Sequence, residues 1–145
     1  MIGISSCLTG KKCRYDGSAR PNEACVALAA SGQAVCLCPE CLAGLPIPRV
    51  PSEIVGGTGA DVLDGRARVM GADGSDRTQE FLRGAAAALA LAKEKGVTRV
   101  MLKSKSPSCG AGQIYDGSFS GRLISGNGVT AELFRRSGIQ IICID

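Results

Sequence analysis

Residues 99–110 read Arg-Val-Met-Leu-Lys-Ser-Lys-Ser-Pro-Ser-Cys-Gly, an apolar run that changes abruptly into a polar, basic loop. The apolar part, residues 99–102, predicts a buried strand. Ser-Pro and Cys-Gly are typical of turns, and a hydrophobic core has no use for this series of lysines, serines and a thiol. In α/β proteins, a loop of this kind at a strand end is a usual place for chemistry. The stretch therefore predicts both the fold class and a site that includes Cys109.

Outward from this strand, apolar runs alternate with helical patterns along the chain. Strands are predicted at residues 1–5, 33–37, 99–102 and 139–144, and helices at 21–32, 75–96 and 130–138. Because the strands are continuous apolar runs, we expect a mainly parallel sheet with helices on both faces. The predicted fold is a single three-layer α/β domain over residues 1–145.

Two segments depart from this alternation. Residues 61–70 predict a small β-hairpin excursion, with Asp64-Gly65 as its turn. Residues 111–128 are rich in Gly and Ser and are too long for a simple turn, so we expect a functional or covering loop there.

The composition limits the class of protein. Hydrophobic residues make up 45% and charged residues 21%, which is usual for a globular protein, and the net charge of +4 is modest. Only 3% of residues are aromatic, which argues against a base-stacking platform for single-stranded nucleic acid. The chain start lacks the pattern of a signal peptide, and no apolar run is long enough to span a membrane. We therefore expect a cytoplasmic protein with no membrane partner.

The cysteine and histidine counts indicate thiol chemistry. The chain has eight cysteines and no histidine, so a metal must be held by Cys or carboxylate side chains. In a reducing compartment, this many cysteines favours metal or redox chemistry over a disulfide framework. Cys25, Cys36 and Cys143 lie inside predicted helices or strands, and we expect them to be core thiols.

Three other cysteines directly follow predicted strands or their loops: Cys7, Cys38 and Cys109. Because the carboxyl ends of parallel strands lie at one edge of a sheet, we expect these thiols to converge. A zinc site would recruit Cys13 or Cys41 as a fourth ligand, whereas a four-iron cluster held by three thiolates keeps one iron open. The Cys-x-x-Cys pair at 38–41 is a weaker candidate for a redox site, because it lacks a thioredoxin-like context.

Basic side chains surround these loops. Arg14 lies in the loop that follows Cys7, and Lys105 lies in the loop that ends at Cys109. A locally positive site favours an anionic ligand such as a nucleotide phosphate or an RNA backbone. We therefore expect Arg14 and Lys105 to bind substrate, and we expect no DNA partner.

Short motifs occur in a characteristic order: Ser6-Cys7-Leu8-Thr9-Gly10, Arg14-Tyr15-Asp16-Gly17, Cys38-Pro39-Glu40, Gly44-Leu45-Pro46-Ile47-Pro48-Arg49, Asp61-Val62-Leu63-Asp64-Gly65, Ser106-Pro107-Ser108-Cys109-Gly110 and Tyr115-Asp116-Gly117. Together they resemble the bacterial thiouracil desulfidase family, whose members long carried only a domain-of-unknown-function label. The resemblance covers nearly the whole chain.

The resemblance implies a [4Fe-4S] cluster held by Cys7, Cys38 and Cys109, and catalytic roles for Glu40 and Ser106. The expected activity is a non-redox hydrolysis in which the C=S of a thiolated uracil, of the 4-thiouridine type, becomes C=O and sulfide is released. The substrate would be a free base, a nucleoside, a nucleotide or a residue in tRNA. The alternative is a non-enzymatic metal-thiolate protein, either a zinc-stabilised fold or an iron–sulfur redox sensor.

Overall fold

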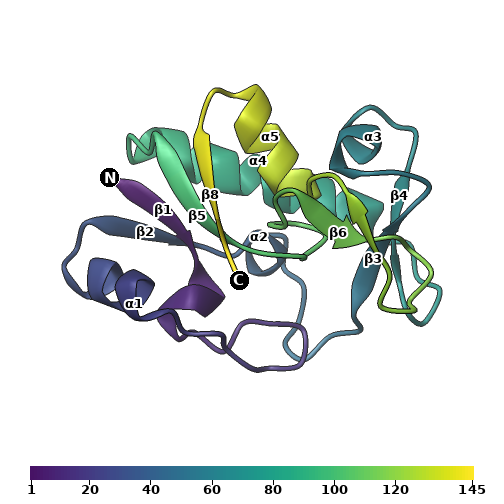
Figure 1. Cartoon of the computed structure of the whole chain (residues 1–145), viewed down its shortest axis with the longest axis horizontal. Helices are drawn as coiled ribbons and strands as arrows, with labels where there is room; N and C mark the ends of the chain where they lie inside the picture. Colours follow the sequence, from purple (N-terminus) through teal and green to yellow (C-terminus); the bar gives the residue numbers. More distant parts are fainter.

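The computed structural model describes residues 1–145 and is built around a four-stranded parallel sheet (Figure 1). Its strands, in spatial order, are β2 (Ala34–Leu37), β1 (Ile2–Ser5), β5 (Arg99–Lys103) and β8 (Gln140–Ile144). The register places Ile4 of β1 opposite Cys36 of β2 and Met101 of β5. The predicted mainly parallel α/β fold is confirmed.

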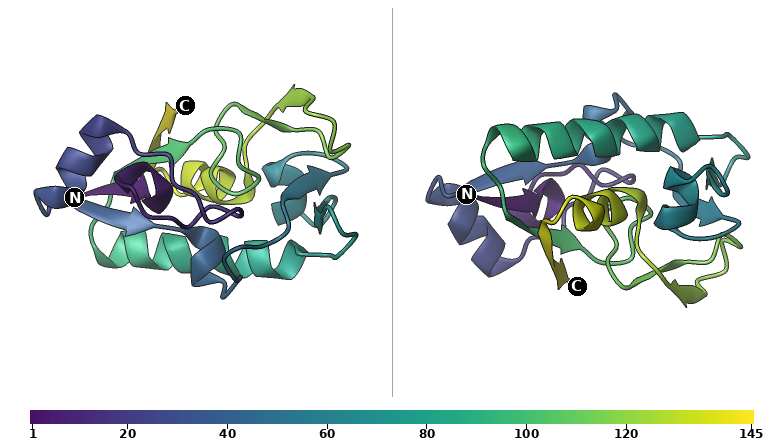
Figure 2. Two further views of the ribbon diagram at one scale, coloured as in Figure 1. Left: turned by 90° about the horizontal axis from the view of Figure 1, so that it is seen from below. Right: turned by 90° about the horizontal axis from the view of Figure 1, so that it is seen from above.

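Helices cover both faces of this sheet, as expected (Figure 2). The longer helices are α1 (Glu23–Ala30), α4 (Thr78–Glu94) and α5 (Val129–Arg136). Successive strand residues point to opposite faces. Ile4 therefore packs with Cys25 of α1 on one face. On the other face, Val100 packs with Ala88 of α4 and Phe134 of α5.

The three thiols expected in the core differ in burial. Cys25 is fully buried and Cys36 is half-buried, but Cys143 is exposed. The expectation for Cys143 was wrong because β8 is an edge strand, so its side chains have a neighbouring strand on one side only.

The excursion near residues 61–70 is antiparallel, as predicted, but its strand partner differs. β4 (Arg68–Gly71) pairs with β3 (Ser52–Val55), and the first half of the predicted hairpin forms α3 (Gly59–Leu63). A capping box explains the helix: the Thr58 side chain accepts from the Asp61 N–H, and the Asp61 carboxylate accepts from the Thr58 N–H at 2.9 Å. This local cap outweighs the short strand-like apolar pattern.

A second small hairpin follows the Cys109 loop. β6 (Gln113–Tyr115) pairs antiparallel with β7 (Leu123–Ser125), so the expected covering loop of residues 111–128 is a hairpin with its own loop at residues 116–122.

Two short helices extend the sheet strands at the carboxyl edge. The 3-10 helix η1 (Ser6–Thr9) follows β1, and α2 (Pro39–Leu42) follows β2.

The sheet has a topological switch point between β1 and β5. The helix that follows β1 lies on one face, whereas the helix that follows β5 lies on the other. Open α/β sheets bind their ligands beyond the strand ends at such a point.

No helix combines the length and the apolar character that crossing a membrane requires.

Candidate functional site

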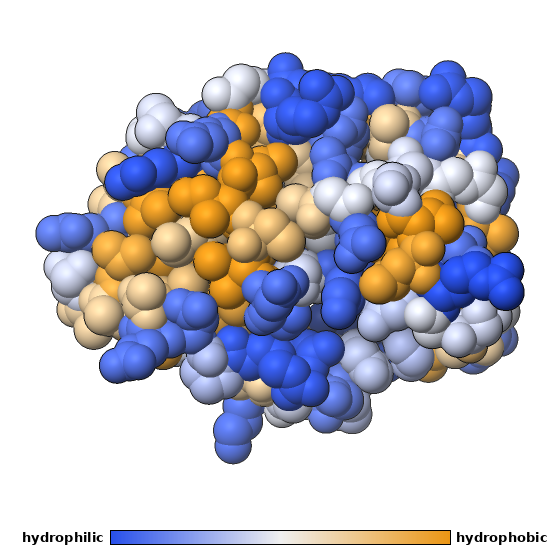
Figure 3. Space-filling model, viewed as in Figure 1, coloured by the Kyte–Doolittle hydropathy of each residue, from blue (hydrophilic) through white to orange (hydrophobic).

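A cavity of about 550 Å³ opens beside the carboxyl ends of β1, β2 and β5. In Figure 3 a hollow near the centre of the visible face is ringed mainly by hydrophilic residues. All seven side chains predicted to form a site line this cavity: Cys7, Arg14, Cys38, Glu40, Lys105, Ser106 and Cys109. The parallel topology thus brings together residues from three chain segments, which follow β1, β2 and β5.

Each of the three predicted metal-binding cysteines lies beyond a strand of the sheet. Cys7 lies in η1, Cys38 caps the N-terminus of α2, and Cys109 ends the loop after β5. Cys7 and Cys109 are buried, whereas Cys38 is half-buried, and all three are free thiols. The cavity wall therefore presents three thiols from three chain segments.

Their surroundings shift the pKa of these thiols in different directions. A hydrogen bond with the Cys13 thiol lowers the pKa of Cys7. Burial raises the pKa of Cys109 to about 12. A hydrogen bond with Cys13, together with burial, raises the pKa of Cys38 far above its usual range. At neutral pH the thiols of Cys38 and Cys109 are therefore protonated, and a metal that binds them displaces their protons.

The donor set fits an iron–sulfur cluster, since such clusters are held by thiolates. No three Cys, Asp or Glu side chains are placed so that they could hold a single metal ion. A cluster of several irons extends over more space than one ion, so its ligands can be distributed around a cavity, and Cys7, Cys38 and Cys109 all line this one. Cys13 interacts with both Cys7 and Cys38, and Cys41 interacts with Cys38 but does not line the cavity.

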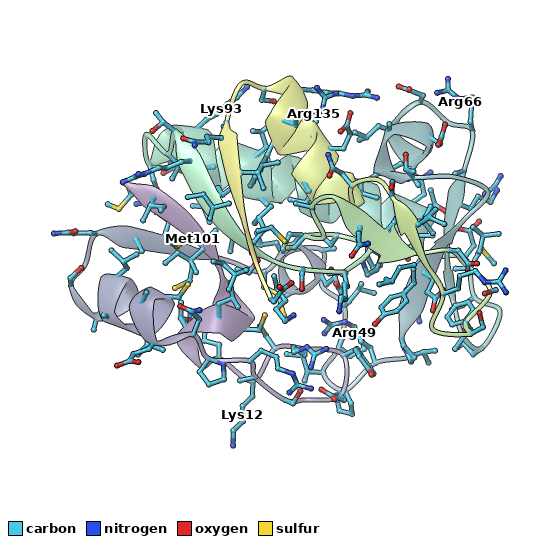
Figure 4. All side chains as sticks on the ribbon, in the orientation of Figure 1. Lys12, Arg49, Arg66, Lys93, Met101 and Arg135 are labelled. Atoms are coloured by element: carbon cyan, nitrogen blue, oxygen red, sulfur yellow. The ribbon has the colours of Figure 1, made fainter.

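Glu40 forms a largely buried ion pair that sequence reasoning missed. The Arg49 Nε lies 2.7 Å from the Glu40 Oε2, and the two side chains are only 7% and 17% exposed. The same guanidinium donates from Nη2 to the carbonyl of Cys13 at 2.9 Å and from Nη1 to that of Pro46 at 3.2 Å. In Figure 4 the labelled Arg49 lies near the centre of the molecule. Arg49 therefore fixes the carboxylate of Glu40 on the cavity wall.

Ser106 organises the loop that carries Cys109. Its Oγ accepts hydrogen bonds from the N–H groups of Ser108 at 3.0 Å and Cys109 at 3.1 Å. Both bonds use the oxygen as acceptor, so the hydroxyl proton stays free to be donated to a ligand in the cavity.

The same loop docks on the start of α5. The N–H of Val129 donates to the Pro107 carbonyl at 2.8 Å, and that of Thr130 donates to the Ser108 carbonyl at 2.9 Å. The hydroxyls of Ser108 and Thr130 are also hydrogen-bonded at 2.8 Å. The first N–H groups of a helix have no partner within it, so α5 gives this loop a rigid base.

Three unpaired cations line the cavity: Arg14, Lys103 and Lys105. Burial lowers the pKa of the Lys103 ammonium, and the positive charge of Arg14 lowers it further. Lys103 lies in the basic part of residues 99–110, but it was not among the residues expected to bind substrate. Lys12, by contrast, points away from the molecule into solvent (Figure 4). The cavity is thus locally positive, which favours an anionic ligand.

Comparison with known proteins gives three matches over nearly the whole chain. Residues 2–145 match a family model described as 2-thiouracil desulfurase. The solved structure of the [4Fe-4S]-dependent thiouracil desulfidase TudS is 42% identical, with a TM-score of 0.85 over 98% of this chain and 89% of that chain. The uncharacterized protein YbbK of Bacillus subtilis (strain 168) is 50% identical over 98% of this chain and 94% of its own length.

Proposed function

Because the chain belongs to the 2-thiouracil desulfurase family, as its motifs predicted, we propose that it is a [4Fe-4S]-dependent desulfidase acting on thiolated uracils. The observation that carries the proposal is the presence of Cys7, Cys38 and Cys109 in one cavity at the switch point of the sheet. The fold shared with TudS, whose name records a [4Fe-4S] cluster and thiouracil, supports it. The reaction replaces the C=S of the substrate with C=O, using water, and releases sulfide without net redox change.

Cys7, Cys38 and Cys109 would hold the cluster, and no other side chain is needed as a ligand. When bound, the cluster supplies an iron without a protein ligand, which can act as a Lewis acid toward the sulfur of the substrate. The positive charge of the nearby Arg14 favours the ionised form of the Cys7 thiol.

Glu40 and Ser106 are the residues that we place next to the substrate. Glu40 is two residues beyond Cys38, and its carboxylate can accept a proton from the attacking water while Arg49 holds it in place. Ser106 can donate its free hydroxyl proton to an acceptor on the pyrimidine ring and so orient it. Histidine is absent from the chain, and the other carboxylate of the cavity, Glu53, accepts hydrogen bonds from backbone N–H groups of the loop at residues 116–122, so we assign this role to Glu40.

The experiment that tests this function compares wild type with Cys109→Ala after anaerobic reconstitution. We expect about four irons per wild-type chain, a brown colour and sulfide release from 2-thiouracil. Cys109→Ala should lose most of its iron and its activity, whereas Cys143→Ala, which changes an exposed thiol outside the cavity, should keep both. A colourless, folded wild-type protein that contains zinc would support the non-enzymatic alternative and overturn the proposal.

We further propose that the substrate carries a phosphate, as in a 4-thiouridine nucleotide or a thiolated tRNA. The support is the group of free cations in the cavity, of which Arg14 and Lys105 are placed to contact a phosphate. Arg14→Gln and Lys105→Gln should each lower kcat/KM about tenfold for 4-thiouridine monophosphate and little for the free base. Lys12→Gln is the matched control, because Lys12 points into solvent. An equal loss for both substrates would exclude the phosphate contact.

All eight cysteines are free, and thiols and iron–sulfur clusters are maintained in reducing compartments. We therefore place the protein in the cytoplasm. Fractionation of cells that express the tagged chain checks this placement.

A further inference from the structure

The aromatic residues of this protein are divided between the core and the cavity. The chain has two tyrosines, three phenylalanines and no tryptophan. Phe81 and Phe134 are buried in the core. The other three, Tyr15, Tyr115 and Phe119, all line the cavity. In a chain so poor in aromatic residues, every ring outside the core therefore lies at the candidate site.

The two tyrosines begin the same four-residue motif. Residues 15–18 and 115–118 both read Tyr-Asp-Gly-Ser. In each, the Asp Oδ1 accepts from the serine N–H two residues later, at 3.0 Å in the first turn and 2.9 Å in the second. Both glycines have positive φ, +78° and +93°, which closes the turn. The same hydrogen-bonded motif thus follows Tyr15 and Tyr115, which are a hundred residues apart in sequence and line one cavity.

Phe119 is held in the cavity wall at a cost in backbone energy. Its φ is +55°, in the left-handed region that residues with a Cβ seldom adopt, and the residue is 40% exposed. The Glu53 carboxylate, which also lines the cavity, accepts from the N–H groups of Gly117 at 3.0 Å and Phe119 at 3.2 Å. An exposed apolar ring and a strained backbone both disfavour this conformation, and Glu53 holds the loop in it nonetheless. Such strain is typical of functional sites.

We propose that Tyr115 and Phe119, with Tyr15, form an aromatic wall against which the planar pyrimidine ring of the substrate stacks, and that Glu53 is the positioning residue of this wall. The inference rests on the proposed function. It adds which residues recognise the pyrimidine ring of the substrate, as distinct from its sulfur. Aromatic faces attract planar rings largely regardless of ring substituents. A thioamide in a ring that is not planar would offer the same C=S to the site but would stack poorly.

The test compares 2-thiouracil with 5,6-dihydro-2-thiouracil, which keeps the C=S and the N–H groups but loses the planar ring. With reconstituted wild type we expect KM to be about tenfold lower for 2-thiouracil, a difference of about 1.4 kcal/mol. Tyr115→Leu and Phe119→Leu should each remove most of this preference by raising KM for 2-thiouracil, with kcat changed less than twofold. Phe119→Tyr should retain the preference for 2-thiouracil, because tyrosine keeps an aromatic ring at this position.

Arg122→Ala is the matched control, since Arg122 is in the same loop, is exposed and does not line the cavity. Glu53→Ala should act like Phe119→Leu, and the double variant should be no worse than either single variant, because both changes remove one interaction. An unchanged preference in Tyr115→Leu and Phe119→Leu, in protein with normal iron content and melting temperature, would overturn the aromatic wall.

The two proposals fail in different ways. If wild type releases no sulfide, the desulfidase function fails, and calorimetric binding of uracil against 5,6-dihydrouracil still tests the wall. Wild type should bind uracil more tightly, and Phe119→Leu should abolish the difference. Equal binding of the two rings by wild type would overturn the wall even if sulfide is released.

Discussion

Arg49 connects three parts of the site through one buried guanidinium. It pairs with Glu40 of α2 and donates to the carbonyls of Cys13 and Pro46, which lie in two different loops. A buried charge is tolerated only while its partner is present, because an unpaired charge cannot recover the solvation that burial removed. The planar guanidinium also offers several donors in fixed directions, which a lysine ammonium does not. The pair is therefore sensitive to changes on either side.

Replacing Arg49 should destabilise the fold as well as the site. We expect Arg49→Met to lower the free energy of unfolding by about 3 kcal/mol, because Glu40 loses the partner of its buried charge. Arg49→Lys should lose less, since it keeps the charge. Glu40→Gln combined with Arg49→Met should regain part of the loss. Urea unfolding followed by circular dichroism measures all four proteins, and wild-type stability in Arg49→Met would show that the pair does not stabilise the fold.

At the scale of elements, α4 fixes the position of α2 through a glycine. A Cβ at Gly84 would clash with the carbonyl oxygen of Pro39 and press on the side chain of Ala43. α2 begins at Pro39 and carries Glu40, and its N-cap is Cys38. The close approach of these two helices therefore sets the position of a proposed cluster ligand and of the proposed catalytic carboxylate.

The substitution Gly84→Ala separates helix propensity from packing. In an open helix it would stabilise by about 1 kcal/mol. Here α2 must move, so we expect a net loss of about 1–3 kcal/mol in unfolding free energy. Iron bound per chain after reconstitution should fall as well. Ala86→Ser, on the exposed face of α4, is the control for both measurements. A more stable Gly84→Ala protein with full iron content would contradict this role of the contact.

The elements that were predicted correctly are those with a continuous apolar pattern. The four sheet strands and α1, α4 and α5 follow from hydrophobic runs and helical spacing, because burial against the core determines them. The helix α3 was missed because a hydrogen-bonded cap involving Thr58 and Asp61 decides it, within a segment of only five residues. Short peripheral elements depend on such local bonds more than on pattern.

For the molecule as a whole, topology explains why part of the site was predictable. Cys7, Cys38 and Cys109 could be placed together because parallel strands end at one edge. Their roles as cluster ligands are proposals that rest on the family. Arg49 and Glu53 were missed because their contacts depend on how irregular loops fold back across the cavity, and no periodic pattern records this.

A buried carboxylate also links α5, which packs on the parallel sheet, to the small antiparallel part of the molecule. Glu132 of α5 is 5% exposed and accepts hydrogen bonds from Asn127, Arg135 and Arg136. Arg136 bonds Asp64, which follows α3, at 3.0 Å, so the network ties α5 to the small antiparallel part. The Arg135 guanidinium is the main cause that lowers the pKa of Glu132 from 4.5 to about 2.

This shift makes the stability of the protein depend on pH. A carboxylate whose pKa is lower in the folded than in the unfolded protein stabilises the fold fully above its unfolded pKa, here 4.5, and loses this contribution as pH falls toward about 2. Allowing for the partly exposed arginines, we expect Glu132→Gln to lower the free energy of unfolding by about 2 kcal/mol at pH 7. The difference from wild type should shrink by roughly half between pH 5 and pH 3. Urea unfolding of both proteins at each pH measures it, with Glu94→Gln at the exposed end of α4 as the control. A difference that stays constant down to pH 3 would show that Glu132 acts through packing and not through its charge.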